Sequence, residues 1–455
     1  MNTFETINPA TEEQLNTYEY YQDSKISHTI DHAHHCWLEW KETSFTERSV
    51  LFRKLKDLLE KKKDQLAEEI TLEMGKPLDQ SVAEIEKCAW VCEYYATNAE
   101  AFLQKEVIKS DASKSYVRYD PLGVVLAVMP WNFPYWQVFR FAAPALMAGN
   151  ACILKHSPNT TACALSIQRI FEEAGFPIYL FNTIIADIPQ IEPIVANKKI
   201  AAVTLTGSTR AGKSLAALAG KYLKKTVLEL GGSDPYLILA DADLNLAAET
   251  CVTGRLINSG QSCIAAKRFI VVSAIKKPFV EKVKKLMEAK VIGNPTADET
   301  DIGPMARKDL MQSLADQVDQ SVKEGAEIVL GGKIDQGRGY YYPPTILANV
   351  KPGMPAYDEE LFGPVASIIE VKDDEEAIKV ANDTIYGLGS AIFTRDLAKA
   401  EIMASKIQAG STFINAFVKS DPRLPFGGIK ESGYGRELSF IGIKEFVNAK
   451  TVYIR

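Results

Sequence analysis

Three residues of the 455-residue sequence have side chains and surroundings suited to carbonyl chemistry. Cys263, in the small and polar segment GQSC, could act as a thiolate nucleophile if its pKa were lowered. Glu229 ends an apolar, strand-like run, where partial desolvation could raise the pKa of its carboxyl group toward that of a general base. Asn132, in the rigid segment PWNFP, could direct its amide N–H groups at a developing oxyanion. Each also has a structural interpretation: a small buried thiol, a solvated loop residue and an aromatic turn.

The segment GSTRAGKS at 207–214 satisfies the P-loop formula, follows the strand-like run AAVTLT and opens a helix. Such a glycine-eased turn directs backbone N–H groups and the helix dipole toward an anionic phosphate. The phosphate could belong to a nucleoside triphosphate, with Lys213 in the loop and Asp241 holding the metal, or to a dinucleotide. The motif alone therefore leaves an ATPase and a dinucleotide-dependent enzyme open.

The histidines and cysteines do not predict a metal centre. Four of the five histidines cluster near the amino terminus, where no cysteine or acidic residue repeats their spacing as a ligand set would: His28, His32, His34 and His35. The seven cysteines lack the close CxxC pairing of zinc or disulfide scaffolds, which favours a reducing compartment. We therefore expect no metal site.

Alternating strand-like and helix-like segments must position the chemical residues. After an amphipathic helix over 46–74, which Gly75-Lys76-Pro77 ends, short β-rich runs alternate with helix-length segments. This alternation is typical of an α/β fold with a largely parallel sheet. A second α/β unit is expected to begin just beyond Gly232. The β-rich runs are 123–129, 151–154, 201–206, 226–230 and 236–239, and the helix-length segments include 161–174 and 212–223.

Composition and charge limit the class of protein. With 46% hydrophobic and 24% charged residues the chain is globular, and its length predicts two or three domains. The net charge of -6 offers no basic excess for a nucleic acid. The apolar stretch 122–154 is interrupted too often to span a membrane, and the amino terminus lacks the pattern of a signal or transit peptide. We therefore expect a cytoplasmic protein that acts on small molecules or protein partners, without nucleic-acid or membrane partners.

The combined motifs resemble the aldehyde dehydrogenase superfamily over nearly the whole chain and in the same order. The motifs that carry the resemblance are Asn132 in PWNFP, the turn 207–212, Glu229 in LELGG, Cys263 in GQSC, Glu360 and Phe362 in EELFGP, and PFGG at 425–428. The resemblance implies that Cys263 adds to an aldehyde, and that the Asn132 amide and the Cys263 backbone N–H hold the resulting alkoxide. Hydride transfer would leave a thioester, and Glu229 would activate the water that hydrolyses it.

The resemblance also implies that the glycine turn binds NAD or NADP rather than a nucleoside triphosphate, so Lys213 would have no role in binding phosphate. The residues that it assigns to the cofactor are Gly207 and Ser208 at the pyrophosphate, Lys155 near the adenosine ribose, Glu360 and Phe362 at the nicotinamide ribose and ring, and Trp131 beside them. NAD-preferring relatives often carry a carboxylate at the position of Pro158, which would repel the extra phosphate of NADP. Here the neutral residues Pro158 and Ser157 would not repel that phosphate, so the sequence allows either NAD or NADP.

For the substrate, Arg140 stands eight residues after Asn132, a position that the resemblance places along the aldehyde tunnel. A guanidinium there could bind a carboxylate bidentately. Ser420 would add a hydroxyl donor, Arg423 a second cation and Trp136 part of the tunnel wall. Arg140 with Ser420 resembles the carboxylate clamp of succinate-semialdehyde dehydrogenases, so NAD(P)-dependent oxidation of succinate semialdehyde to succinate is the leading expectation. The alternatives are a surface or interdomain ion pair for Arg140, and glutarate semialdehyde or a general aliphatic aldehyde as the substrate.

The resemblance implies a Rossmann-like cofactor domain, an α/β catalytic domain and a small β oligomerisation flap. We expect the cofactor domain at 1–101 and 122–231, the catalytic domain at 232–435 and the flap at 102–121 and 436–455. Such flaps pair between subunits, so a homodimer or homotetramer is expected. Two alternatives from other classes stay open: a P-loop ATPase, and a catalytically silent relative that kept the fold.

Overall fold

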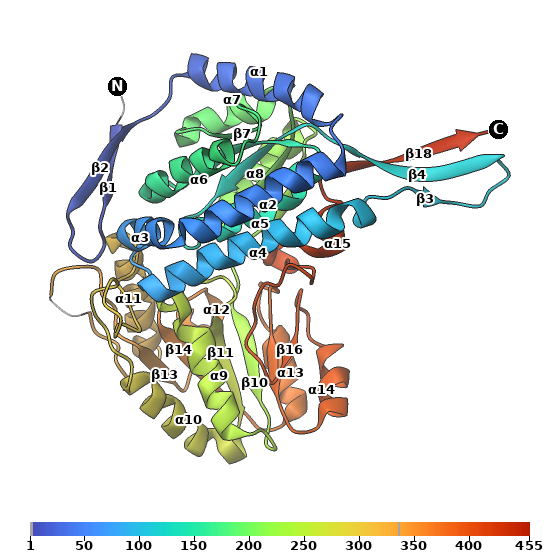
Figure 1. The fold of residues 1–455 in the computed structure, drawn as a ribbon. Coiled ribbons are helices and arrows are strands. Elements are labelled where there is room, and N and C mark those ends of the chain that lie inside the picture. The colour runs from blue at the N-terminus through green and yellow to red at the C-terminus, as the bar shows by residue number, and fades with distance from the viewer. Residues whose placement is uncertain (1–2, 335–336) are drawn as a thin grey trace.

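The computed structural model of the chain describes residues 3–334 and 337–455 (Figure 1). Two large sheets lie one above the other in the view of Figure 1, with helices α1–α8 around the upper sheet and α9–α14 around the lower one. A third, smaller sheet extends to one side of the upper half. The predicted α/β class with largely parallel sheets is confirmed.

The upper sheet has six strands in the order β17–β9–β8–β5–β6–β7. Five of them run parallel, and the short strand β17 at one edge is antiparallel. Because the carboxyl ends of parallel strands meet at one edge, the segments that follow β5, β6, β8 and β9 lie along the same edge of the sheet. The strands are β5 (Val124–Met129), β6 (Ala151–His156), β7 (Phe181–Thr183), β8 (Ile200–Thr206), β9 (Lys225–Glu229) and β17 (Gly433–Tyr434).

The helices of the upper half include a break that the sequence pattern does not show. The pattern predicts one helix over 46–74, whereas the structure has α2 and α3, separated at Lys62 (φ −103°, ψ 9°). No proline or glycine lies at the break, and α2 and α3 both pack against α4. Tertiary contacts rather than a local breaker therefore set the bend. The helices are α1 (Asp23–Trp40), α2 (Phe45–Lys61), α3 (Lys63–Met74), α4 (Leu78–Phe102), α5 (Trp136–Met147), α6 (Thr161–Glu173), α7 (Ile191–Ala196) and α8 (Thr209–Lys221).

The lower sheet has seven strands in the order β12–β13–β14–β11–β10–β15–β16, parallel except for the pair β12–β13. The chain passes from the upper to the lower sheet at Gly232, which lies between the end of β9 and the start of β10. The strands are β10 (Asp234–Ile238), β11 (Ala266–Val272), β12 (Glu327–Leu330), β13 (Thr345–Ala348), β14 (Val365–Val371), β15 (Ala391–Phe393) and β16 (Phe413–Ile414). The helices are α9 (Leu244–Leu256), α10 (Ser273–Glu288), α11 (Lys308–Lys323), α12 (Pro355–Asp358), α13 (Asp374–Asn382) and α14 (Leu397–Ala404).

The third sheet joins the end of the chain to a segment far earlier in the sequence. Strand β18 (Val447–Ile454) pairs antiparallel with β4 (Lys114–Pro121), and β3 (Glu106–Val107) pairs with the other side of β4. Figure 1 shows these strands projecting from the body of the molecule. Two further elements are the hairpin of β1 (Thr3–Ile7) and β2 (Gln14–Glu19), and the short helix α15 (Ser439–Gly442).

Buried apolar side chains form one large cluster around the upper sheet and two around the lower one. Along β10, Leu237 belongs to one of the lower clusters, and its neighbours Tyr236 and Ile238 belong to the other, so these two clusters fill opposite faces of that sheet. In the part of the chain that the structure describes, no helix is both long and apolar enough to cross a bilayer. Nor do three or more His, Cys, Asp or Glu side chains in that part come together as ligands for a metal ion.

Candidate active site

Two cavities meet at Cys263. The first, here called the α4–α5 cavity, has a volume of about 260 Å³ and is lined by residues of α4 and α5, by Cys263 and by the segment 417–420. The second, the glycine-turn cavity, has a volume of about 230 Å³ and is lined by Gly207, by the PWNFP loop, by Glu360 and by Cys263. A thiol at this junction can face a different small molecule in each cavity.

Cys263 follows a tight, left-handed backbone segment. The last three residues of η3 (Ile257–Gly260) have φ values of 54°, 52° and 75°. This conformation costs a residue other than glycine roughly 1–3 kcal/mol, so surrounding contacts must hold it. Asn258 Nδ2 donates hydrogen bonds to the backbone oxygens of Asn132, at 2.7 Å, and Gln261, at 3.1 Å. These bonds tie the loop that carries Cys263 to the PWNFP loop.

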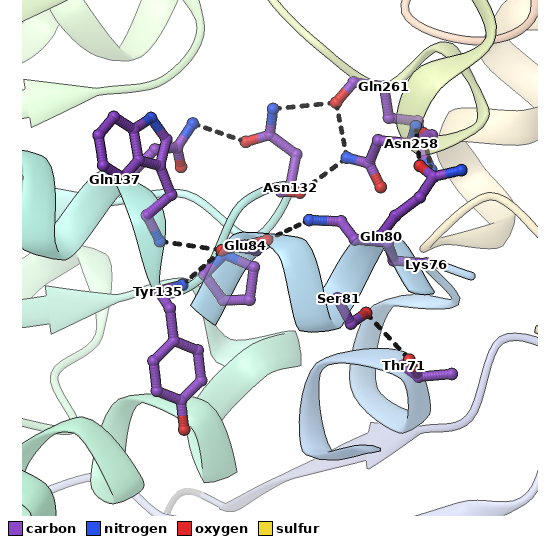
Figure 2. A network of polar contacts seen from close by, with 12 residues as sticks. Thr71, Lys76, Gln80, Ser81, Glu84, Asn132, Tyr135, Gln137, Asn258 and Gln261 are labelled. Carbon is purple, nitrogen blue, oxygen red and sulfur yellow. Dashed lines mark hydrogen bonds and ion pairs between the residues drawn. The ribbon is translucent and has the colours of Figure 1, made fainter. Parts of the chain in front are cut away.

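The side-chain amide of Asn132 is held in one orientation (Figure 2). Its Oδ1 accepts a hydrogen bond from Gln137 Nε2 at 3.0 Å, and its Nδ2 donates to Gln261 O at 3.0 Å. A flipped amide would set donor against donor and acceptor against acceptor, so the network identifies the nitrogen. Asn132 and Cys263 both line the glycine-turn cavity. The structure thus brings the predicted oxyanion donor and the predicted nucleophile to one cavity.

The Cys263 thiol is half-buried. Burial raises its pKa to about 12, while the positive charges of Arg140 and Lys267 act in the opposite direction. Lys267 Nζ donates to the backbone oxygens of Ser262 and Cys263, at 2.8 Å each, and lies 3.3 Å from a carboxylate oxygen of Glu360. The thiol is therefore protonated near neutral pH, and its attack on a carbonyl needs a proton acceptor or added positive charge.

Glu229, the last residue of β9, is buried, with 2% of its surface exposed. Neither of its carboxylate oxygens has a hydrogen-bond partner among the described residues. Burial raises the pKa of its carboxyl group well above the ordinary range, Glu437 raises it further, and Arg140 and Arg436 lower it. Glu229 does not itself line either cavity, but the next two residues, Leu230 and Gly231, line the glycine-turn cavity. A buried, unpaired carboxyl group of raised pKa has the properties of a general base.

The predicted cofactor residues form two groups at the same edge of the upper sheet. One group lines the glycine-turn cavity: Trp131, Gly207, Ser208, Glu360 and Phe362. The other stands at the carboxyl end of β6, outside that cavity: Lys155, Ser157 and Pro158. Ser208 caps α8, with its Oγ accepting a hydrogen bond from Ala211 N at 3.3 Å, and the start of this helix offers N–H groups to a phosphate. Because β6 and β8 flank β5, the two groups can be spanned by an elongated dinucleotide.

The structure argues against a P-loop ATPase. The Lys213 side chain is 63% exposed, and its amine lies 2.8 Å from a carboxylate oxygen of Glu431. Asp241 follows β10 in the other sheet, where its carboxylate accepts hydrogen bonds from Thr394 Oγ1 at 2.7 and 2.8 Å. A triphosphate at the glycine turn would therefore find neither the lysine nor the acidic residue that the motif requires.

Three of the four predicted substrate residues line the α4–α5 cavity, namely Trp136, Arg140 and Ser420. The fourth residue, Arg423, does not line this cavity. Its guanidinium donates to both carboxylate oxygens of Asp421, at 2.9 and 2.6 Å, and its side chain is 66% exposed. A carboxylate two residues away holds this arginine outside the site.

Arg140 has a structural partner. It is buried on α5, forms an ion pair with the buried carboxylate of Glu437, and lies with its guanidinium 4.5 Å from the ring centre of Phe426. Its charge is therefore balanced within the protein, as the ion-pair alternative supposes. A ligand carboxylate at Arg140 would have to compete with Glu437.

Sequence reasoning missed two cations of the α4–α5 cavity, the exposed Lys419 and the less accessible Lys87. This half-buried residue of α4 donates from Nζ to Ser420 Oγ at 2.8 Å, and Nζ lies 4.3 Å from the ring centre of Trp136. In the sequence Lys87 follows Glu84 and Glu86, and a lysine beside glutamates in a helix is typical of a solvated face. No local signal separates it from its neighbours.

Comparison with known proteins gives consistent matches over the whole chain. A family model described as "Aldehyde dehydrogenase family" matches residues 1–452. A probable NADP(+) succinate-semialdehyde dehydrogenase of Synechocystis sp. is 48% identical over 449 residues, which cover 99% of each chain. NADP(+) succinate-semialdehyde dehydrogenase 1 of Mycobacterium tuberculosis is 48% identical over 452 residues, with the same coverage. The crystal structure of succinic semialdehyde dehydrogenase from Streptococcus pyogenes, in complex with NADP+, superposes with a TM-score of 0.97 at 38% identity over 99% of each chain.

Proposed function

Because the chain belongs to the aldehyde dehydrogenase family, we propose that it oxidises succinate semialdehyde to succinate with NADP+ as the hydride acceptor. The observation that carries this proposal is the position of Cys263 at the junction of two cavities. One cavity has a helix start suited to a dinucleotide, and the other has cations and a hydroxyl group suited to a carboxylate. The names of the relatives at 48% identity support the same substrate and cofactor.

In the first step the Cys263 sulfur bonds to the aldehyde carbon, and the thiol proton passes to a water molecule. The π electrons of the carbonyl group become a lone pair on its oxygen, which turns into an alkoxide. Asn132 Nδ2 and the backbone N–H of Cys263 donate hydrogen bonds to that oxygen. Loss of one such donor typically costs about 2.7–4 kcal/mol of transition-state stabilisation. Gln137 keeps the Asn132 amide in the orientation in which its nitrogen is the donor toward Gln261.

When bound, NADP+ supplies the acceptor for the hydride that leaves the substrate carbon. The product of that transfer is a thioester on Cys263. Glu229 then takes one proton from a water molecule as the water oxygen bonds to the thioester carbon. The C–S bond breaks, and the new carboxyl group gives its remaining proton to the leaving sulfur, which releases the carboxylate and restores the Cys263 thiol. Burial raises the pKa of Glu229 well above its ordinary range, which makes its carboxylate a stronger base than an exposed one.

For the cofactor, Gly207 and Ser208 at the start of α8 would hold the pyrophosphate, and Glu360 and Phe362 the nicotinamide half. The group at the end of β6 would face the adenosine half. The residues of this group are Lys155, Ser157 and Pro158, none of which is acidic. The extra phosphate of NADP would therefore meet a lysine, and none of these three residues carries a carboxylate that would repel it, which supports a preference for NADP+ over NAD+.

For the domains, we propose that the upper sheet is the core of the cofactor domain, the lower sheet the core of the catalytic domain, and the third sheet an oligomerisation flap. The corresponding ranges are 1–101 with 122–231, 232–435, and 102–121 with 436–455. The short edge strand β17 lies in the range 232–435 but pairs with β9 of the upper sheet. Exposed apolar side chains on the projecting strands, Val107, Tyr453 and Ile454, support pairing with a second copy. A homodimer or homotetramer in the cytoplasm follows from this proposal.

Absorbance of reduced nicotinamide, recorded with several aldehydes, tests the proposal. We expect a higher kcat/KM with succinate semialdehyde than with butanal, which has the same number of carbons and no carboxylate, and a higher kcat/KM with NADP+ than with NAD+. Equal values for succinate semialdehyde and butanal would contradict the proposed substrate. A folded protein that reduces neither cofactor with any aldehyde would instead be a catalytically silent relative.

A further inference from the structure

Four charged side chains line the α4–α5 cavity: Glu84, Lys87, Arg140 and Lys419. Two of them have buried partners of opposite charge, since Glu84 pairs with Lys76 and Arg140 with Glu437. Lys419 is exposed to solvent, which screens its charge. Lys87 is half-buried, and among the described residues no carboxylate lies within ion-pair distance of its amine. The cavity therefore presents one poorly solvated positive charge that the protein does not balance.

The carboxylate of Glu84 does not balance Lys87, because its hydrogen-bonding capacity is used elsewhere. One of its oxygens binds the buried amine of Lys76. The other accepts the backbone N–H groups of Tyr135 and Trp136, at 2.9 Å each, and so holds the start of α5 (Figure 2). Glu84 is thus a structural anchor between α4 and α5, and its negative charge is satisfied there.

The hydroxyl group next to Lys87 is arranged as a donor. Ser420 Oγ accepts a hydrogen bond from Lys87 Nζ at 2.8 Å and another from Trp136 Nε1 at 3.0 Å. A serine hydroxyl has two acceptor lone pairs and one O–H, so these bonds occupy both acceptor positions and leave the hydrogen to donate. An acceptor that enters the cavity can take this O–H and one of the remaining N–H groups of Lys87 together.

We propose that Lys87 and Ser420 bind the carboxylate of the substrate, and that Lys87, rather than Arg140, is the cation that selects carboxylated aldehydes. The inference rests on the proposed function, because it assigns a receptor to the carboxylate of that substrate. A carboxylate bound to Lys87 and Ser420 would keep its aldehyde end in the same cavity that Cys263 lines. Arg140 would act as the partner of Glu437 and as part of the wall.

The surroundings of Lys87 add support. Burial lowers the pKa of Lys87 to about 8, and the charge of Arg140 acts in the same direction. The carboxylates of Glu84 and Asp421 act in the opposite direction, but each is bound to another cation, Lys76 and Arg423. The face of Trp136 offers the amine only a cation–π contact. A ligand carboxylate would supply the missing negative charge through charge-assisted hydrogen bonds.

Steady-state kinetics with succinate semialdehyde and butanal test this inference on three variants of the full-length enzyme. Lys87→Met keeps the side-chain stem over Trp136 and removes the charge. Lys87→Arg keeps the charge, and Lys419→Met removes the other unpaired lysine of the cavity. We expect Lys87→Met to raise KM for succinate semialdehyde by about 10- to 160-fold, the value of one charge-assisted hydrogen bond, with little change in KM for butanal. Lys87→Arg should retain most of the preference for the carboxylated aldehyde, and Lys419→Met should change KM by less than about threefold.

The outcomes separate this inference from the proposed function. If the wild-type enzyme does not prefer succinate semialdehyde to butanal, the proposed substrate fails, and the role of Lys87 fails with it. If the wild type has the preference and Lys87→Met keeps it, only the role of Lys87 is overturned. An equal loss of kcat for both aldehydes in Lys87→Met would indicate a structural role, which also overturns the inference. Activity of each variant with butanal shows that the variant is folded.

Discussion

Removing Arg140 alone should destabilise the protein more than removing Arg140 and Glu437 together. The two side chains are 3% and 4% exposed, so Arg140→Met leaves the Glu437 carboxylate buried without its cation and near the carboxyl group of Glu229. Breaking a buried ion pair from one side costs about 3–5 kcal/mol, whereas replacing both partners by apolar residues is often close to neutral. We expect Arg140→Met to lower the free energy of unfolding by about 3–5 kcal/mol, and Glu437→Leu to lower it by a comparable amount. The double variant should recover most of the lost stability.

Urea unfolding of the wild type, the two single variants and the double variant, followed by tryptophan fluorescence, measures the coupling free energy between Arg140 and Glu437. If the losses of unfolding free energy in the two single variants simply add up in the double variant, with a coupling free energy below about 0.5 kcal/mol, the ion pair does not stabilise the buried Arg140 and the reasoning is refuted. KM values give the second readout. Wild-type stability in Arg140→Met, together with a rise in KM for succinate semialdehyde alone, would return the role of carboxylate receptor to Arg140.

Three further substitutions test separate parts of the site. Asn132→Ala removes one oxyanion donor and should lower kcat about 10²- to 10³-fold at unchanged fold, measured by reduced-nicotinamide absorbance and circular dichroism; a loss below tenfold would contradict the assigned role. Pro158→Glu places a carboxylate just after β6, where the extra phosphate of NADP+ would bind. Like charges about 4 Å apart repel by about 1–4 kcal/mol, so KM for NADP+ should rise about tenfold or more. KM for NAD+, which lacks this phosphate, should change little. Burial lowers the pKa of His156 from 6.5 to about 4, so its contribution to stability is full above about pH 6.5 and is lost as the pH falls toward 4. Between these pH values the unfolding free energy of the wild type should fall by about 3 kcal/mol more than that of His156→Gln, and parallel pH curves would exclude this contribution.

The sequence predicts the parts of the site that short motifs carry. Asn132, Gly207 and Cys263 each lie in a local segment whose composition already indicates its chemistry, and the fold brings all three to one cavity. Strand β5, which precedes Asn132, is recognisable because it is a continuous and almost fully buried apolar run, as central strands of a parallel sheet are. Local information was sufficient to find these segments, whereas the contacts of Asn258 that tie the Cys263 loop to the PWNFP loop join residues far apart in the sequence.

The parts that the sequence could not predict depend on contacts between distant residues. Lys87 and Ser420 are 333 positions apart, and nothing around either residue indicates the other. The partner of Arg140 is Glu437, on a segment near the end of the chain, while Arg423 is held by Asp421 only two positions away. Charged side chains find their partners through tertiary packing, so the sign and spacing of charges do not show which arginine is free to bind a ligand.

Trapping the thioester tests the role of Cys263 as the nucleophile most directly. In Glu229→Gln the water that cleaves the thioester lacks its base, so a single addition of succinate semialdehyde and NADP+ should yield a burst of about one NADPH per active site. Intact mass and peptide mapping should then show one succinyl group, attached to Cys263. NADPH formation without an adduct at Cys263, an adduct on any of the other six cysteines, or undiminished turnover in Cys263→Ala would contradict the assignment.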